Sequence, residues 1–270
     1  MRHSMAARGV LLALSLSALL AACTTQNTVV PVSGAPDRIN PTEEADAKKR
    51  ARARLELASA YYSRGEMTTA LDQVKIALVA DPQYGEAYNL RGLIYSGLGD
   101  QALAEDSFRQ ALQINPRDPD TMHNYGWVLC QQKRYPESFE MFRQALAVPQ
   151  YRGTARTLLA EGVCQAFAGQ LAESEASLSR AYELDPSSPF AATNLAEVLY
   201  RRGDYERARF YVRRVNSQPA ISNAQTLWLA ARIENKLGNR TGATDFGSQL
   251  RNRFPDSREA ALFARGAFDE

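Results

Sequence analysis

The chain has 270 residues, 45% of them hydrophobic, and its 32 Lys and Arg residues nearly balance 30 Asp and Glu residues. The first 22 residues carry only Arg2 and Arg8 among these charges, which leaves 30 basic and 30 acidic residues in the remainder. A net charge near zero argues against nucleic-acid binding, which needs a basic footprint. The basic run at residues 48–54 is interpreted as a solvated helix face with acidic neighbours.

Residues 1–22 have the features of an export signal. Arg2 and Arg8 precede an apolar run over residues 10–20, which is too short to remain as a membrane-spanning helix. Residues 20–23, Leu-Ala-Ala-Cys, resemble the lipobox of bacterial lipoproteins, in which the cysteine thiol receives diacylglycerol and becomes the new N-terminus. The alternative is an ordinary signal with a coincidental cysteine.

The lipobox resemblance implies a triacylated Cys23. Several acyl chains would anchor the protein firmly in a membrane, whereas a single chain binds a membrane only marginally. Thr24 follows Cys23, in place of the Asp that the resemblance associates with retention at the inner membrane. The expected location is therefore the outer membrane of a Gram-negative bacterium, with the protein lipid-anchored and facing the periplasm.

A flexible tether is expected to follow, so that residues 23–39 comprise the lipidated cysteine and the tether. Residues 24–39 are rich in Thr, Gln, Asn, Ser, Gly and Pro and have no helical period. Such a coil spans on the order of 20–25 Å. Asn40, Pro41 and Glu43 then form a helix-start signature, which predicts a first helix from about residue 41.

Residues 85–118 carry a spaced pattern of small, aromatic and proline residues. The pattern consists of Tyr88, Gly92, Tyr95, Ala104, Phe108, Ala111 and Pro116. These are the spacings of a tetratricopeptide repeat, a helix-turn-helix unit of about 34 residues. Gly92 and Ala104 allow the two helices to approach closely, while Phe108 fills the remaining space and Pro116 ends the second helix.

The pattern recurs along the chain and predicts an all-α fold, a right-handed superhelical solenoid of about six tetratricopeptide repeats with a C-terminal capping helix. The expected repeats are 40–84, 85–118, 119–152, 153–188, 189–222 and a degenerate 223–255, followed by the capping helix at 256–270. In the sixth repeat Phe246 fits, whereas Gly242 and Gln249 stand where alanine is expected. Asp256 and Glu259 mark the expected start of the capping helix.

The turn inside each repeat provides a second check on this count. The position after the first helix carries Gly65, Gly99, Lys133, Gly169, Gly203 and Gly238. Glycine is favoured there because a helix end commonly requires a left-handed backbone.

No catalytic or cofactor motif stands out, and the chain is not expected to be an enzyme or to bind a metal, a cofactor or a small-molecule substrate. His123 precedes Cys130 by seven residues on one predicted helix, so the two are candidates for a nucleophilic pair. His123 has no second metal ligand or activating carboxylate at an obvious spacing, which favours a surface or groove residue.

Cys130 and Cys164 stand near equivalent places in neighbouring repeats. An oxidising periplasm would permit a disulfide between them. The sequence does not supply the Cα separation that a disulfide requires, and free buried cysteines behave as small hydrophobes, so free thiols are favoured.

The concave groove of such arrays is lined by positions 2, 5, 9 and 12 of each first helix, which share one face. The candidate groove residues are Leu55, Tyr62, Asn89, Leu93, His123, Trp127 and Tyr200, with Cys130, Leu159, Val163 and Phe190 at further slots. This composition predicts a groove that binds an apolar or aromatic segment of a partner protein. In the alternative, about half of the rings pack against the next repeat.

Two segments of the third repeat are more specific than the repeat pattern: His-Asn-Tyr-Gly-Trp at 123–127 and Gln-Gln-Lys-Arg-Tyr at 131–135. Together with the lipobox and tether they resemble the PilF/PilW pilotin family of type IV pilus biogenesis lipoproteins. The resemblance implies a non-enzymatic protein that binds secretin subunits and promotes their outer-membrane localisation and multimerisation. It associates the secretin contact with the early repeats, here Leu55, Tyr62, Asn89 and Leu93. The alternative is a repeat lipoprotein that scaffolds cell-wall hydrolases or other envelope assembly machinery.

Overall fold

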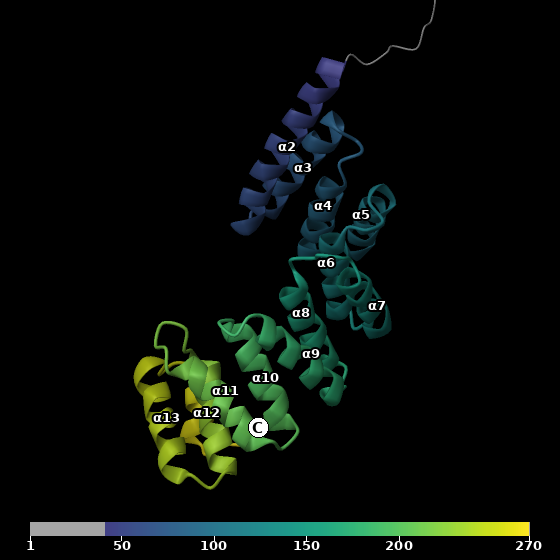
Figure 1. Ribbon diagram of the computed structural model, residues 1–270. Coiled ribbons are helices and arrows are strands. Elements are labelled where there is room, and N and C mark those ends of the chain that lie inside the picture. The colour runs from purple at the N-terminus through teal and green to yellow at the C-terminus, as the bar shows by residue number, and fades with distance from the viewer. Residues whose placement is uncertain (1–40, 270) are drawn as a thin grey trace, which may run out of the picture. The chain divides into compact units, whose positions relative to one another are not determined.

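A computed structural model describes residues 41–269 of the chain (Figure 1). The expected signal at 1–22, the lipid attachment site Cys23, the tether at 24–39 and the capping residue Asn40 lie outside the described residues. The described part consists of helices and connecting turns without a strand, so the predicted all-α repeat fold is confirmed.

The helices pair into six successive hairpins. The pairs are α2 (Pro41–Ser63) with α3 (Met67–Ala80), α4 (Gly85–Leu98) with α5 (Gln101–Ile114), α6 (Pro119–Gln131) with α7 (Tyr135–Leu146), α8 (Thr154–Phe167) with α9 (Leu171–Leu184), α10 (Pro189–Arg201) with α11 (Tyr205–Asn216), and α12 (Ala224–Lys236) with α13 (Arg240–Arg253). A short helix, α14 (Arg258–Ala264), follows the sixth hairpin. The predicted start of the first helix near residue 41 is confirmed.

In the second, third and fourth hairpins, the two helices approach closely at a glycine of the first helix. A Cβ atom added to Gly92 would lie 2.8 Å from the ring of Phe108, and one added to Gly162 would lie 2.6 Å from Cγ of Leu178. Real Cβ atoms do not approach other atoms so closely, so only glycine fits. In these hairpins the predicted pairing of a small residue on the first helix with a large one on the second is thus the packing rule, whereas the first, fifth and sixth hairpins carry Ala58, Ala196 and Ala230 at the glycine position.

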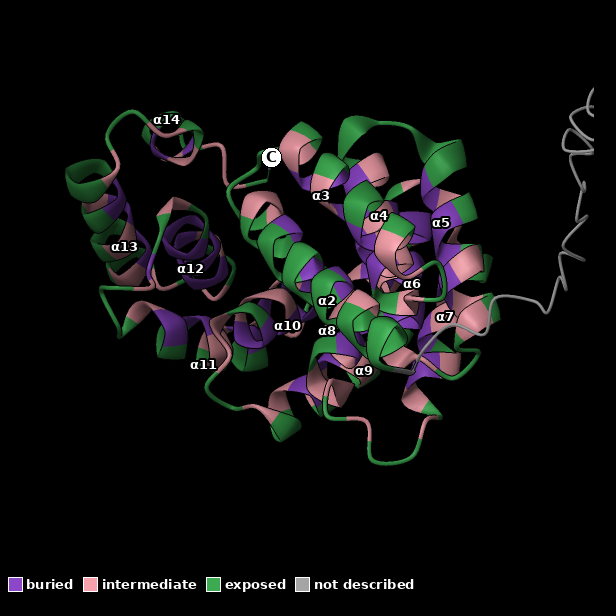
Figure 2. Cartoon of the chain, turned by 90° about the horizontal axis from the view of Figure 1, so that it is seen from above, coloured by how far each residue is buried: buried purple, intermediate pink, exposed green. Residues whose placement is uncertain are grey.

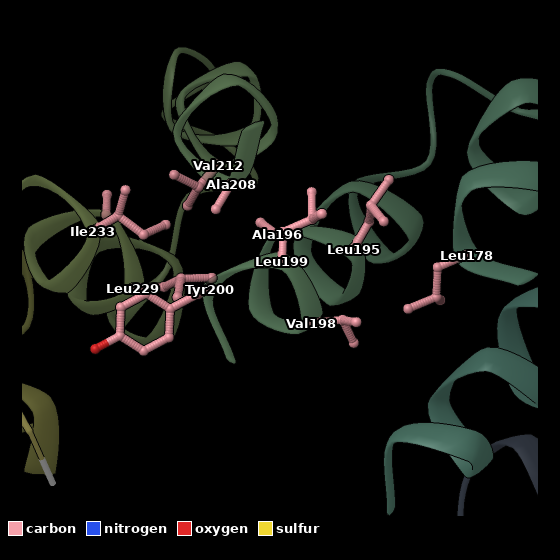
Figure 3. Packing of buried hydrophobic residues seen from close by; sticks show 11 residues of the cluster. Leu178, Leu195, Ala196, Val198, Leu199, Tyr200, Ala208, Val212, Leu229 and Ile233 are labelled. Carbon is pink, nitrogen blue, oxygen red and sulfur yellow. The ribbon is translucent and has the colours of Figure 1, made fainter. Parts of the chain in front are cut away.

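Consecutive hairpins share apolar cores. Figure 3 shows the buried residues of one such core, in which Leu195 and Leu199 come from α10, Val212 from α11 and Ile233 from α12, and all four are fully buried. Buried residues lie where neighbouring helices meet, and exposed residues cover the outward sides (Figure 2). Neighbouring hairpins therefore stabilise one another through these shared cores, as in other repeat arrays.

The turn inside every hairpin has the left-handed backbone that the glycine pattern predicts. The turn glycines have φ between +75° and +85°, and Lys133 adopts φ +62° at the same position in the third repeat. A side chain in this region is strained by about 1 kcal/mol relative to glycine.

We expect Lys133→Gly to raise the free energy of unfolding by roughly 0.5–1 kcal/mol, because it removes this strain. Gln131→Gly is the control, since Gln131 is the exposed last residue of α6, where glycine relieves no strain and costs up to about 1 kcal/mol. Urea unfolding followed by circular dichroism measures both changes. If Lys133→Gly destabilises the protein as Gln131→Gly does, the backbone at Lys133 is not strained.

In the sixth hairpin the expected register of the second helix is wrong by one residue. The buried residues of α13 are Ala243, Gly247 and Leu250, whereas Gly242 and Phe246 are half-buried and Gln249 is exposed. The cause lies before the helix, because Gly238 follows Gly203 by 35 residues rather than 34. When positions are counted from Gly238, Ala243 stands at the same interval after the turn as Ala104 does after Gly99.

The capping helix completes the sixth hairpin. Counted from the turn, Gly247 stands where Phe108 and Phe142 stand in earlier repeats, and the ring of Phe263 from α14 lies over it, 1.9 Å from where a Cβ atom would be. The capping helix thus supplies the ring that α13 lacks. Its N-cap is Ser257, whose hydroxyl accepts from the Ala260 amide, rather than the expected Asp256.

Candidate protein-binding surfaces

Three of the predicted groove residues are buried and do not form an open groove. Leu55 belongs to the core of the first hairpin. Tyr200 is buried, with the guanidinium of Arg232 stacked 4.4 Å from its ring centre. His123 is buried beneath the fourth repeat. The prediction of these three as partner contacts is wrong, because the next repeat covers the side of the first helix on which they lie.

His123 takes part in a polar network between the third and fourth repeats. Its Nδ1 atom forms a hydrogen bond of 2.9 Å with Oγ1 of Thr157, which also bonds the Tyr151 hydroxyl at 3.0 Å. Arg156 pairs with Asp120 at 2.5 Å beside it. Burial, and to a smaller extent the charge of Arg156, lowers the pKa of His123 to about 4. The imidazole is therefore neutral at pH 7 and structural in role.

Cys130 and Cys164 form a disulfide that links α6 to α8, with their Cα atoms 5.9 Å apart. The expectation of free thiols is therefore wrong. Near-equivalent positions on adjacent first helices bring the two cysteines within the separation that a disulfide needs. The pairing also removes Cys130 as a nucleophile for His123.

Of the other predicted groove residues, Tyr62, Asn89, Leu93, Trp127, Leu159 and Val163 are half-buried, and Phe190 is 71% exposed. Asn89 accepts a hydrogen bond of 3.1 Å from the Asn124 amide, and Trp127 packs on the disulfide and Phe142. Each of them keeps part of its surface accessible to a partner. The expected aromatic groove is thus reduced to a few partly exposed side chains.

A larger apolar surface lies on the first hairpin, where the sequence analysis did not expect it. Helices α2 and α3 enclose a groove of about 680 Å³. Its lining residues are Arg50, Ala53, Arg54, Leu57, Ile76, Val79 and Ala80. Val79 is 83% exposed and Ile76 43%, which is unusual for large aliphatic side chains. These seven residues are called the first-repeat groove below.

Comparison with the later repeats indicates that these aliphatic residues are not required by the repeat fold. At the helix position of Ile76 the later repeats carry Gln110, Gln144, Arg180 and Arg214. At the position of Val79 they carry Gln113, Ala147, Glu183 and Ser217. This difference in residue type at equivalent helix positions is the sequence signal that could have identified the groove. Contiguous exposed apolar residues with a polar rim are typical of protein interaction sites.

The described residues offer little for metal chemistry or membrane insertion. Within 41–269, no group of three or more His, Cys, Asp or Glu side chains is placed to hold a metal ion. None of the helices in this range is long and apolar enough to cross a bilayer.

Comparisons with known proteins agree with this architecture. Models of the tetratricopeptide repeat match residues 42–85, 85–118, 119–187 and 159–219. The type IV pilus assembly protein PilF of Pseudomonas aeruginosa is 27% identical over 225 residues, which cover 83% of this chain and 89% of PilF.

Two solved structures have the same arrangement of helices. The crystal structure of PilW, a widely conserved type IV pilus biogenesis factor, matches with a TM-score of 0.73 and 32% identity, covering 79% of this chain and 98% of PilW. The structure of Pseudomonas aeruginosa PilF matches with a TM-score of 0.73 and 25% identity, covering 82% of this chain and 99% of PilF. The chain therefore belongs to the tetratricopeptide-repeat proteins and, within them, to the PilF/PilW type.

Proposed function

We propose that the chain is an outer-membrane lipoprotein pilotin of type IV pilus biogenesis, which binds secretin subunits and promotes their localisation and multimerisation in the outer membrane. Similarity to PilF and PilW over nearly all of the described array supports a repeat protein of type IV pilus biogenesis that acts as a protein-interaction adaptor. The secretin partner and the lipid anchor go beyond this similarity and belong to the proposal.

The observation that carries the proposal is the first-repeat groove. Leu57, Ile76 and Val79 form an apolar surface that the repeat fold does not require. Arg50 and Arg54 line one side of it, and Arg54 donates to Gln73 across the hairpin at 2.9 Å. An apolar secretin segment with an acidic residue beside it would satisfy both the apolar surface and the arginines.

The lipid anchor provides the location in this proposal. Cys23 is the expected attachment site, and the tether between it and α2 would allow the first hairpin to work away from the membrane surface. Lipidation would then carry a bound secretin subunit to the outer membrane.

Replacing Ile76 and Val79 by the glutamines that occupy their positions in the second repeat tests the groove. The double variant Ile76→Gln/Val79→Gln should fold normally, because Gln110 and Gln113 are accommodated at those positions. We expect at least a tenfold loss of secretin captured by affinity purification from solubilised membranes, since the apolar contact is removed. Phe210→Gln, at an exposed ring of the fifth repeat, is the control.

Unchanged secretin capture by the Ile76→Gln/Val79→Gln chain would exclude the groove as the secretin contact. Capture of cell-wall hydrolases in place of a secretin would select the alternative scaffold function. Circular dichroism of both variants establishes that the helices remain folded.

Cys23→Ser tests the anchor separately. We expect a folded protein that leaves the outer-membrane fraction, accompanied by loss of secretin multimers from that fraction. The measurement is membrane fractionation followed by immunoblotting of both proteins. Secretin multimers that remain undisturbed in the outer membrane would contradict the pilotin function, even if the groove binds a protein.

A further inference from the structure

The C-terminal tail folds back onto the last repeat. After α14 the chain reverses at Gly266, whose φ is +66°. The amide of Gly266 donates to the Phe263 carbonyl and that of Ala267 to the Leu262 carbonyl, each at 3.0 Å. This closure is a common helix ending in which a left-handed glycine redirects the chain. It directs the residues that follow toward α12.

Three side chains of α12 hold the tail. The ring of Phe268 stacks on Trp228, with the ring centres 5.3 Å apart. Arg232 Nε donates to the Phe268 carbonyl oxygen at 3.3 Å, and Lys236 Nζ pairs with Asp269 at 2.5 Å. The three residues are four apart in sequence, so they lie in one row along the helix. This row of Trp228, Arg232 and Lys236 is called the tail site below.

The tail site has the elements of a site that recognises a peptide. Trp228 offers an aromatic face, Arg232 a donor for a main-chain carbonyl, and Lys236 a charge for a carboxylate. Arg232 is held in place because its guanidinium stacks over the ring of Tyr200 at 4.4 Å. A donor fixed in this way loses little freedom when a peptide binds.

The tail combines a packed ring with an exposed acidic end, since Phe268 also packs edge-on against Phe263 of α14, with the ring centres 5.9 Å apart. The Asp269 side chain is 81% exposed, and Phe268 is half-buried. A hollow of about 290 Å³ continues beyond Trp228 and Arg232, between α10 and α12, where Asn194, Glu197 and Gln225 add polar groups. The tail therefore fills only part of a longer surface, and a segment of the same chemistry would meet the same three side chains of α12 if it replaced the tail.

We infer that the tail site binds protein segments in which an aromatic residue is followed by an acidic one, and that the chain's own tail occupies the site and competes with them. The tail itself defines the chemistry of the ligand: Phe268 for the ring, its carbonyl for Arg232 and Asp269 for Lys236. The inference does not depend on the pilus function, because it concerns the sixth repeat rather than the first.

Removing the tail tests this inference. The probe is a fluorescein-labelled peptide with the sequence of residues 264–270, titrated by fluorescence anisotropy against the full chain and against a chain that ends at Arg265. We expect the shortened chain to bind at least tenfold more tightly, because no resident tail competes. A peptide with alanine in place of phenylalanine should bind at least tenfold more weakly. Absence of binding to the shortened chain, or equal affinity in both chains, would overturn the inference.

A second pair of variants keeps the test valid if shortening disturbs α14. Phe268→Ala in the full chain leaves α14 and Gly266 in place, and it should bind the labelled peptide at least fivefold more tightly than the wild type. Adding Lys236→Glu should abolish this gain, and a peptide with lysine in place of the aspartate should restore it. If the charge exchange has no effect on affinity, the peptide does not occupy the tail site and the inference fails.

Discussion

Reduction of the Cys130–Cys164 disulfide is expected to lower the free energy of unfolding by about 4 kcal/mol, the largest single effect on stability that we predict. The bridge joins residues 34 apart, and a covalent link over such a loop restricts the unfolded chain. It also connects α6 to α8, the first helices of adjacent repeats. In a repeat array that interface has no support from distant parts of the chain, so its loss weakens the middle of the array.

Urea unfolding of the wild-type chain with and without dithiothreitol measures this contribution. The double variant Cys130→Ala/Cys164→Ala is the control, because its unfolding should be insensitive to the reductant. A change on reduction of less than about 1 kcal/mol would show that the packing of α6 on α8 is sufficient without the bond.

The repeat architecture could be predicted from sequence because each repeat depends on a few local rules. Gly92 and Gly162 mark the close contact of two helices, and the residue at the turn adopts the left-handed backbone even where it is Lys133. These features depend on residues within one repeat. The register error at Gly242 arose where the interval between turns lengthened by one residue, which is visible only when the count starts at the turn.

The surfaces were harder to predict because they depend on how one repeat lies on the next. The position of a residue within the repeat indicates the side of the helix on which His123 and Tyr200 lie. It does not indicate that the following repeat covers that side. The disulfide was missed for the same reason, because predicting it requires the distance between α6 and α8. The first-repeat groove was overlooked because Ile76 and Val79 resemble core residues until they are compared with the residues at their positions in the later repeats, most of which are polar.

Lowering the pH from 7 to 4.5 is expected to destabilise the wild-type chain more than a His123→Gln variant. Burial lowers the pKa of His123 to about 4, against about 6.5 in an unfolded chain. Between these values the unfolded state binds more protons than the folded state, so stability falls as the pH falls through this window. The contribution of the neutral imidazole is fully present above about pH 6.5, and its complete loss corresponds to about 3 kcal/mol.

Glutamine is the matched replacement because its side-chain amide can still bond Thr157 but does not titrate in this range. Urea unfolding at pH 7, 6, 5 and 4.5 gives the two stability profiles, and their difference isolates His123 from the carboxylates that also titrate as the pH falls. Arg156 and Asp120 act on the imidazole in opposite directions, so Asp120→Asn should widen the difference by lowering the pKa of His123 further. Parallel profiles for the wild type and His123→Gln would mean that the imidazole takes up its proton without disturbing the contact between the third and fourth repeats.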